Sequence, residues 1–212
     1  MSASSIGGVY AITPAVPDTQ HLMALCEAAL KGGVAVLQYR EKTGDVALRH
    51  EQASELLELC GQYSVPFIIN DDLRLADLIG ADGVHLGQDD GSLHEARIIL
   101  GPGKLVGMSC YQSLELAHKA QSQHADYVAF GSFFPSLTKP QAKRADVSLL
   151  LAASREISLP IVAIGGITLE NAGDLIDAGA DAIAVISALF EAPDVEAAAH
   201  GLNALFEIES EN

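Results

Sequence analysis

The chain of 212 residues is 49% hydrophobic, which is enough to bury the core of one domain. Its 12 Lys and Arg residues against 28 Asp and Glu residues leave a formal net charge of -16, which excludes the extended basic face that nucleic acids and anionic membranes require. The three cysteines lack a CxxC spacing, and there is neither a basic leader nor a membrane-length apolar run, so we predict a cytoplasmic protein with reduced thiols.

Eight short apolar runs recur along the chain, separated by stretches with the helical spacing of apolar residues. The runs are nearly continuously apolar, as expected of parallel strands that are covered on both faces. They are residues 9–12, 33–37, 66–69, 81–86, 104–108, 125–130, 160–164 and 180–185. This α/β pattern predicts a single (β/α)8 TIM-barrel catalytic domain over residues 1–212. An open doubly wound sheet is the structural alternative, but no GxGxxG follows the first run.

Polar residues follow the second run, at the strand ends where barrels of this kind carry their active sites. Strand alternation puts Gln38, Arg40 and Lys42 on one side and Tyr39 and Glu41 on the other. An amide and two cations on one side suit the oxygens of a diphosphate. The alternative is a solvated loop with an Arg–Glu pair.

Acidic residues follow the third and fourth runs. Asn70, Asp71 and Asp72 stand in a row, and Asp72 is placed to cap the helix after it. Asp71 is then left to face the barrel mouth, where Asp89 offers a second carboxylate for Mg²⁺. The alternative is two unrelated caps, with Asp90 capping the next helix. Two further caps are expected at Asp146 and Thr168.

A hydroxyl follows the fifth run, at Ser109. No GxSxG surrounds it and the sequence positions no histidine for it, so we expect a hydrogen-bonding role and no nucleophile. His85 lies inside the fourth run, and we expect it, like the other histidines, to be a satisfied core or surface residue.

The loop after the sixth run, residues 132–147, gathers cations in an acidic chain. It holds Lys139, Lys143 and Arg144, three of the 12 Lys and Arg residues. Ser136, Leu137 and Thr138 precede Lys139 directly, so two hydroxyls and an ammonium group come close together. A loop of this length is typical of a lid. Lys143 and Arg144 are equally consistent with a solvated flank.

The seventh and eighth runs lead into Gly165-Gly166 and Ile186-Ser187. Glycine lets backbone N–H groups approach a ligand closely, and these two loops are the usual phosphate site of phosphate-binding barrels. The predicted barrel mouth thus has two sides. The side after the second to fourth runs, with Lys139, suits a diphosphate and a metal, and the side after the seventh and eighth runs suits a monophosphate. Two phosphorylated substrates joined with loss of pyrophosphate fit that layout.

Taken together, the motifs resemble the thiamine-phosphate synthase family, in order and through nearly all of the chain. They are Gln38-x-Arg40-x-Lys42, Asn70-Asp71-Asp72, Gly83-Val-His-Leu-Gly-Gln with Asp89, Gly107-x-Ser109, Pro135-Ser-x-Thr-Lys139, Ala163-Ile-Gly-Gly-Ile167 and Val185-Ile-Ser187. The family often has Thr at the position of Ser136, and serine keeps the hydroxyl while losing a methyl group.

The resemblance implies a (β/α)8 barrel that joins hydroxymethylpyrimidine diphosphate to a thiazole phosphate, giving thiamine phosphate and pyrophosphate. It implies that Asp71 and Asp89 bind Mg²⁺. It implies that the pyrimidine diphosphate is held by Gln38, Arg40, Lys42, Asn70, Ser109 and Lys139. It implies that the thiazole phosphate is held by Ser136, Thr138, Gly166, Ile186 and Ser187. Tyr39, Glu41 and Leu137 lie in the same motifs and are expected to bind substrate with them.

The expected chemistry follows from the charges. The pyrimidine C–O bond breaks while Mg²⁺ and three cationic side chains, Arg40, Lys42 and Lys139, stabilise the departing pyrophosphate. Ser109 is expected to be catalytic together with these three residues. The aminopyrimidine delocalises the cation, and the thiazole nitrogen captures it without a protein base. Closure of the lid would keep water away.

Three other functions remain as alternatives. A thiazole tautomerase needs only the monophosphate side, and a phosphate-ligand sensor needs neither a metal pair nor a cationic lid. An aldolase usually needs a lysine within a strand, and Lys104 stands at the wrong strand end. The partners expected are small molecules. A homo-oligomer is also compatible with the pattern, because dimer surface cannot be distinguished from helix-packing stripes.

Overall fold

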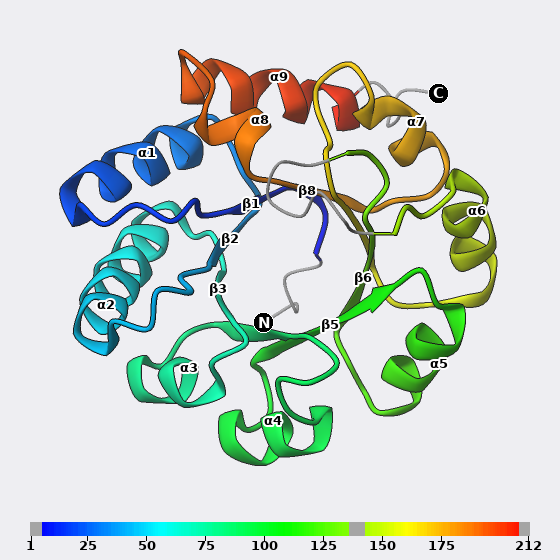
Figure 1. Cartoon of the computed structure of the whole chain (residues 1–212), viewed down its shortest axis with the longest axis horizontal. Helices are drawn as coiled ribbons and strands as arrows, with labels where there is room; N and C mark the ends of the chain where they lie inside the picture. The colour runs from blue at the N-terminus through cyan, green and yellow to red at the C-terminus, as the bar shows by residue number, and fades with distance from the viewer. Residues whose placement is uncertain (1–5, 136–142, 208–212) are drawn as a thin grey trace.

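Eight parallel strands close into a barrel in which each strand pairs with its neighbours in chain order and β8 returns to β1 (Figure 1). The computed structural model describes residues 6–135 and 143–207. The strands are β1 (Gly8–Ile12), β2 (Val36–Tyr39), β3 (Phe67–Asn70), β4 (Gly83–Leu86), β5 (Leu105–Tyr111), β6 (Tyr127–Gly131), β7 (Ile161–Ile164) and β8 (Ala182–Val185). The predicted (β/α)8 fold is confirmed.

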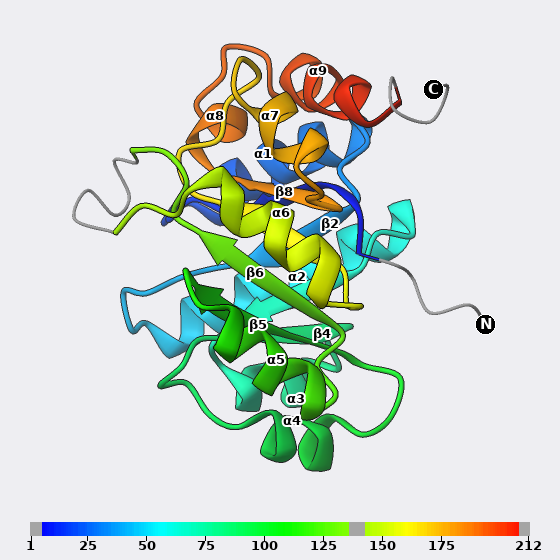
Figure 2. The same ribbon diagram turned by 90° about the vertical axis from the view of Figure 1, so that its right-hand side faces the viewer.

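Helices form a ring around the barrel (Figures 1 and 2). They are α1 (Thr19–Lys31), α2 (Val46–Tyr63), α3 (Leu73–Ile79), α4 (Leu93–Leu100), α5 (Leu114–Ser122), α6 (Val147–Glu156), α7 (Ala172–Asp177), α8 (Ser187–Phe190) and α9 (Val195–Glu207). Within the described ranges, no helix combines the length and the apolar character needed to cross a bilayer.

Apart from the end of β5 at the exposed Tyr111, the strands are buried on both faces, which explains the continuously apolar runs. In β1, Val9 and Ala11 pack in the layer between strands and helices, whereas Tyr10 and Ile12 belong to the cluster inside the barrel. Ile6, just before β1, is 3% exposed and joins the inner cluster. The barrel is therefore filled by side chains on its axis, apart from the cavity described below.

Three strands contain polar residues that the apolar runs place just after the strand. They are β2 with Gln38, β3 with Asn70 and β5 with Ser109. The longer β5 pairs with β6 across a register shift between Ser109 and Tyr111. Polar residues can continue a strand here because the ladder hydrogen bonds depend on the backbone and not on side-chain polarity.

Two of the three predicted helix caps are confirmed. Asp72 Oδ1 accepts from Leu75 N at 3.0 Å, and Asp146 Oδ1 accepts from Ser148 N at 2.9 Å. The cap predicted at Thr168 is wrong, because α7 begins only at Ala172. Thr168 N instead donates to Asn171 Oδ1, so its turn precedes the helix.

Aspartates at the amino ends of three strands join neighbouring strands by a recurring reciprocal pair of hydrogen bonds. Asp82 N donates to Phe67 O at 3.0 Å, and Asp82 Oδ2 accepts from Phe67 N at 2.9 Å. Asp126 makes the same pair with Val106, and Asp181 makes it with Ile161. Each carboxylate thereby gives an acceptor to a backbone N–H at the first or second residue of a neighbouring strand.

We predict that Asp82→Ala lowers the free energy of unfolding by about 1–3 kcal/mol, because it leaves the N–H of the fully buried Phe67 without an acceptor. Asp82→Asn keeps an oxygen acceptor and should lose less than about 1 kcal/mol. Urea denaturation at equilibrium measures both. Equal losses would contradict the hydrogen-bond explanation.

Candidate functional site

A cavity of about 750 Å³ opens at the carboxyl end of the barrel. This volume suits a small-molecule ligand. The predicted site residues that line it come from the ends of β2, β3, β5, β7 and β8, and they are Gln38, Arg40, Asn70, Ser109, Gly166, Ile186 and Ser187. Barrel closure therefore brings these distant segments together.

Other predicted residues lie away from the cavity lining. The Tyr39 hydroxyl donates to Gln52 Oε1 of α2 at 2.9 Å in a buried contact, so its side chain points toward the helix layer. Burial raises the pKa of Tyr39. Glu41 accepts a hydrogen bond from Thr43 N in its own loop. Strand alternation explains both, because Tyr39 and Glu41 alternate with the lining residues Gln38 and Arg40.

The predictions for Ser136, Leu137, Thr138 and Lys139 lie outside the described residues. The flanking residues Pro135 and Lys143 both line the cavity. Gln112 Nε2 donates to Gly131 O and, at 3.1 Å, to Lys143 O. One amide thus connects the end of β6 to the chain just before α6.

Gly165 and Gly166 form the cavity wall after β7, and both have positive φ, at 107° and 65°. A Cβ on Gly166 would lie 2.3 Å from Pro135 O, and one on Gly165 would lie 2.0 Å from Ser132 Oγ. Glycine is therefore required at both positions, by its conformation and by the close approach of the β6 loop.

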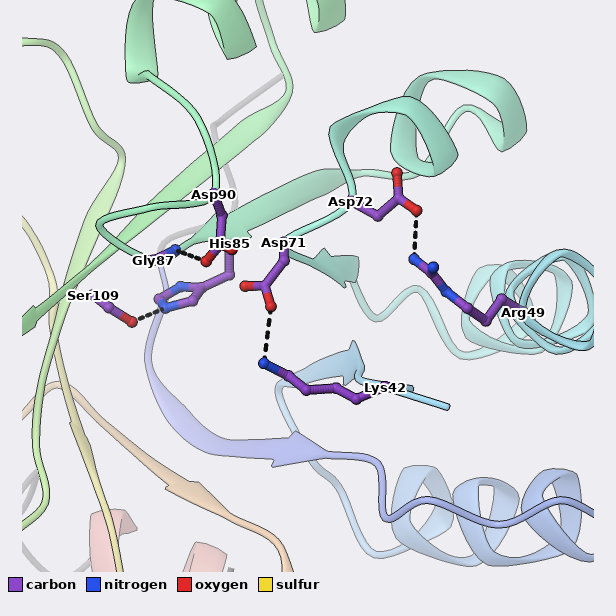
Figure 3. A network of polar contacts seen from close by, with 8 residues as sticks. All are labelled: Lys42, Arg49, Asp71, Asp72, His85, Gly87, Asp90 and Ser109. Carbon is purple, nitrogen blue, oxygen red and sulfur yellow. Dashed lines mark hydrogen bonds and ion pairs between the residues drawn. The ribbon is translucent and has the colours of Figure 1, made fainter. Parts of the chain in front are cut away.

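Charged groups gather on the rim beyond β3 and β4 (Figure 3). Lys42 Nζ lies 3.2 Å from Asp71 Oδ2, and Asp71 has a φ of 63°. Asp71 N donates to His85 O at 2.9 Å, which ties the end of β3 to β4. Asp72, the next residue, points away and pairs with Arg49 of α2.

The carboxylate that meets Asp71 is Asp90 and not Asp89. Asp90 Oδ2 accepts from Gly87 N at 3.0 Å, and its carboxyl group lies beside that of Asp71 (Figure 3). Partial desolvation, and then the neighbouring Asp71 carboxyl group, raise the pKa of Asp90. Asp89 and Asp90 are both exposed, so exposure does not distinguish them. The sequence offered two adjacent aspartates, and only the loop conformation distinguishes them.

Asp90 was also the alternative candidate for capping the next helix, and that interpretation is wrong. Ser92 caps α4, with its hydroxyl accepting from Glu95 N at 3.1 Å. Within residues 6–135 and 143–207, no three His, Cys, Asp or Glu side chains form a metal-binding group. Mg²⁺ typically needs only one or two carboxylates when substrate phosphates complete its coordination.

A chain of four side-chain hydrogen bonds crosses the cavity floor. Gln38 Nε2 donates to the Tyr10 hydroxyl at 2.8 Å, and Tyr10 meets the Tyr127 hydroxyl at 2.8 Å. The Tyr127 hydroxyl lies 3.1 Å from His85 Nδ1. His85 Nε2 lies 2.9 Å from Ser109 Oγ, and Figure 3 shows this last contact. All five residues line the cavity.

This chain corrects one prediction and adds residues that the sequence did not single out. A histidine does stand beside Ser109, contrary to the expectation. His85 is buried and hydrogen-bonded as expected, but its partners belong to the cavity. Tyr10 and Tyr127 lie within apolar runs, where the sequence does not distinguish a tyrosine that lines a cavity from one that packs in the core. Burial is the main reason that the pKa of both phenols is raised.

Comparison with known proteins shows similarity along the whole barrel. A family model described as thiamine monophosphate synthase matches residues 9–189. The thiamine-phosphate synthase of Thiobacillus denitrificans is 69% identical over 205 residues, covering 97% of each chain. That of Methylobacillus flagellatus is 55% identical, covering 97% of this chain and 98% of the other. A solved thiamine phosphate pyrophosphorylase from Pyrococcus furiosus has a TM-score of 0.85 and 33% identity, covering 95% of this chain and 96% of that one.

We predict that Asp90→Asn raises the melting temperature at about pH 7 by about 1–3 °C in the absence of divalent metal. The raised pKa means that the folded protein holds the Asp90 proton more tightly than the unfolded chain does. Its stabilising contribution is present at low pH and is lost as the pH rises through the raised pKa. The advantage of Asp90→Asn should therefore disappear below about pH 4.

The matched control is Asp89→Asn, which removes the same charge from the neighbouring residue. It should leave the melting temperature unchanged at both pH values in thermal scans with a chelator present. A gain in Asp89→Asn and none in Asp90→Asn would mean that Asp89 is the partner of Asp71.

Proposed function

The chain belongs to the thiamine-phosphate synthase family, and we propose that it joins 4-amino-2-methyl-5-(diphosphooxymethyl)pyrimidine to a thiazole phosphate, giving thiamine phosphate and pyrophosphate. It is a transferase of thiamine biosynthesis, and we propose that it acts in the cytoplasm. The observation that carries the specific reaction is the single cavity in which the β2, β3 and β5 ends face the β7 and β8 ends.

The diphosphate side of the cavity is built around Arg40, which lines the cavity while its backbone N–H donates to Thr13 Oγ1 at 2.9 Å. Lys42 extends from the same loop toward Asp71. Asn70 and Ser109 add neutral polar groups to the same wall. A guanidinium and an ammonium group beside neutral donors suit a diphosphate joined to an uncharged ring.

The thiazole phosphate is assigned to the wall formed by Gly166, Ile186 and Ser187. Gly165 and Gly166 both line the cavity, and Ser187 contributes a hydroxyl at the start of α8. The family resemblance assigns Ser136 and Thr138 to the same phosphate, and Ser136 follows the lining residue Pro135 directly in the sequence. The assignment of Gly166, Ile186 and Ser187 agrees with the phosphate-binding loops usual for this barrel, which follow strands 7 and 8.

The contact between Asp71 and Asp90 fits Mg²⁺. Two carboxylates in contact repel each other unless a cation or a shared proton compensates, and hard oxygen ligands are those that Mg²⁺ prefers. We propose Asp71 as one ligand, as predicted, and a residue of the β4–α4 loop as the other, for which the structure favours Asp90 over Asp89. Bound there, Mg²⁺ would supply neutralising charge for the departing pyrophosphate.

The protein groups have positioning and charge-stabilising tasks. Arg40, Lys42 and Lys139 hold the diphosphate as its C–O bond breaks, and the electron-rich aminopyrimidine carries the resulting positive charge. The cavity holds the thiazole nitrogen close to that carbon. A protein nucleophile is not needed, and the phenols of Tyr10 and Tyr127 stay protonated because burial raises their pKa.

Pyrophosphate release by the purified protein tests this function. We expect release only when both phosphorylated substrates and Mg²⁺ are present, with thiamine phosphate appearing in equal amount. Removing the metal with a chelator should abolish turnover, and adding Mg²⁺ back should restore it. Ligand binding without pyrophosphate release would instead support a sensor or a thiazole tautomerase.

We predict that Lys139→Ala lowers kcat by about 10²-fold or more, because it removes a cation from the charge that develops on the leaving group. The affinity for the thiazole phosphate, measured by calorimetry, should change much less. The surface variant Lys31→Ala, which removes a pairing partner of Glu27 far from the cavity lining, serves as the control. An unchanged kcat in Lys139→Ala would exclude this role.

A further inference from the structure

The chain of hydrogen bonds from Gln38 to Ser109 has only two directions in which each phenol proton finds an acceptor within the chain. Each of the two phenols has one proton to donate, burial keeps both protonated, and a buried O–H without an acceptor is costly. If Tyr10 accepts from Gln38, it donates to Tyr127, which then donates to His85 Nδ1. If instead Tyr10 donates to Gln38, every bond along the chain is reversed. Within this chain, the orientation of the Gln38 amide therefore determines which ring nitrogen of a neutral His85, on the other side of the barrel, carries the proton.

The structure gives the direction of the first bond, in which Gln38 Nε2 donates to Tyr10, and the directions of the other three bonds are inferred from it. His85 Nδ1 then accepts from Tyr127, and the proton of a neutral His85 lies on Nε2, facing Ser109. Ser109 Oγ accepts this hydrogen bond and keeps its own proton for a ligand. At the other end, Gln38 Oε1 has no hydrogen-bond partner among the described residues and is left as an acceptor.

We propose that Tyr10, Tyr127 and His85 are positioning residues that couple the amide of Gln38 to the hydroxyl of Ser109. Through them the two ends meet the substrate as a fixed acceptor and a fixed donor. This assignment rests on the proposed function for the identity of that substrate. An aminopyrimidine offers the matching pattern, since its amino group donates and its ring nitrogens accept.

The same direction explains why the Ser109–His85 pair does not act as a nucleophile. A serine is activated when the neighbouring imidazole nitrogen is unprotonated and can take the hydroxyl proton. In the inferred direction His85 Nε2 carries the proton, and its other nitrogen faces a phenol where a hydrolase would place a carboxylate. The chain of hydrogen bonds from Gln38 through Tyr10, Tyr127 and His85 to Ser109, which we call the relay, therefore keeps Ser109 as a hydrogen-bond donor and protects the diphosphate from attack.

The tautomer of His85 tests the relay without any substrate. In ¹⁵N-labelled protein, NMR should show His85 protonated on Nε2 alone, with the signals assigned by their loss in His85→Gln. Gln38→Glu should move the proton to Nδ1 at about pH 9, because an ionised carboxylate can only accept and so reverses every bond. Adding Tyr10→Phe should prevent this change, since it interrupts the relay.

The matched control is Gln121→Glu, an equal change on α5, where the side-chain oxygen accepts from Ser158 and no relay residue is involved. It should leave the His85 signals unchanged. A wild-type His85 protonated on Nδ1, or on both nitrogens, would overturn the proposal even if no variant folds. An unchanged tautomer in folded Gln38→Glu would also overturn it.

Kinetics then separate the relay from the proposed function. Tyr127→Phe should lower kcat/KM for the pyrimidine diphosphate about tenfold, and should add little to the loss in Ser109→Ala, because both changes affect the same donor. Tyr63→Phe, which removes a hydroxyl bonded to Glu27, should have no effect. Additive losses with an active wild type would overturn the positioning role alone. A wild type that forms no thiamine phosphate would overturn the proposed function, and the tautomer would still decide the relay.

Discussion

Hydrogen bonding between β8 and β1 closes the sheet, and the site depends on this closure. In a closed parallel barrel all strand carboxyl ends lie at one end, so residues as distant in sequence as Gln38 and Ser187 line one cavity. Closure also places Tyr10 of β1 across the interior from Tyr127 of β6, 117 residues later, at hydrogen-bonding distance. An open sheet would leave β1 and β8 as edges and would separate these groups.

Neutral and charged groups occupy different depths of the site. The floor is made of buried, hydrogen-bonded neutral side chains, including Tyr10, Tyr127 and Gln38, whereas Arg40, Lys42 and Asp71 lie at or near the rim. Charge is costly to bury without a partner, which explains this separation. For the proposed substrate, the uncharged pyrimidine ring would lie on the floor and the diphosphate at the rim.

The two ends of the barrel have different tasks. At the amino ends of the strands, Asp82, Asp126 and Asp181 are committed to backbone N–H groups of neighbouring strands. At the carboxyl ends, Asp90 lies beside Asp71, and desolvation together with that neighbouring carboxyl group raises the pKa of Asp90. The same residue type thus stabilises the fold at one end and, by our proposal, holds the metal at the other.

The sequence by itself determined the barrel, its strand order and the caps at Asp72 and Asp146, because apolar periodicity and capping preferences are local properties of the chain. It also identified Gln38, Arg40 and Ser109 as residues of strand ends. Only the tertiary structure decided that Asp90 meets Asp71, that Tyr39 turns toward α2, and that His85 joins Ser109 to a chain of phenols. Those outcomes depend on loop conformation and on contacts across the closed barrel, and neither leaves a periodic signal in the sequence.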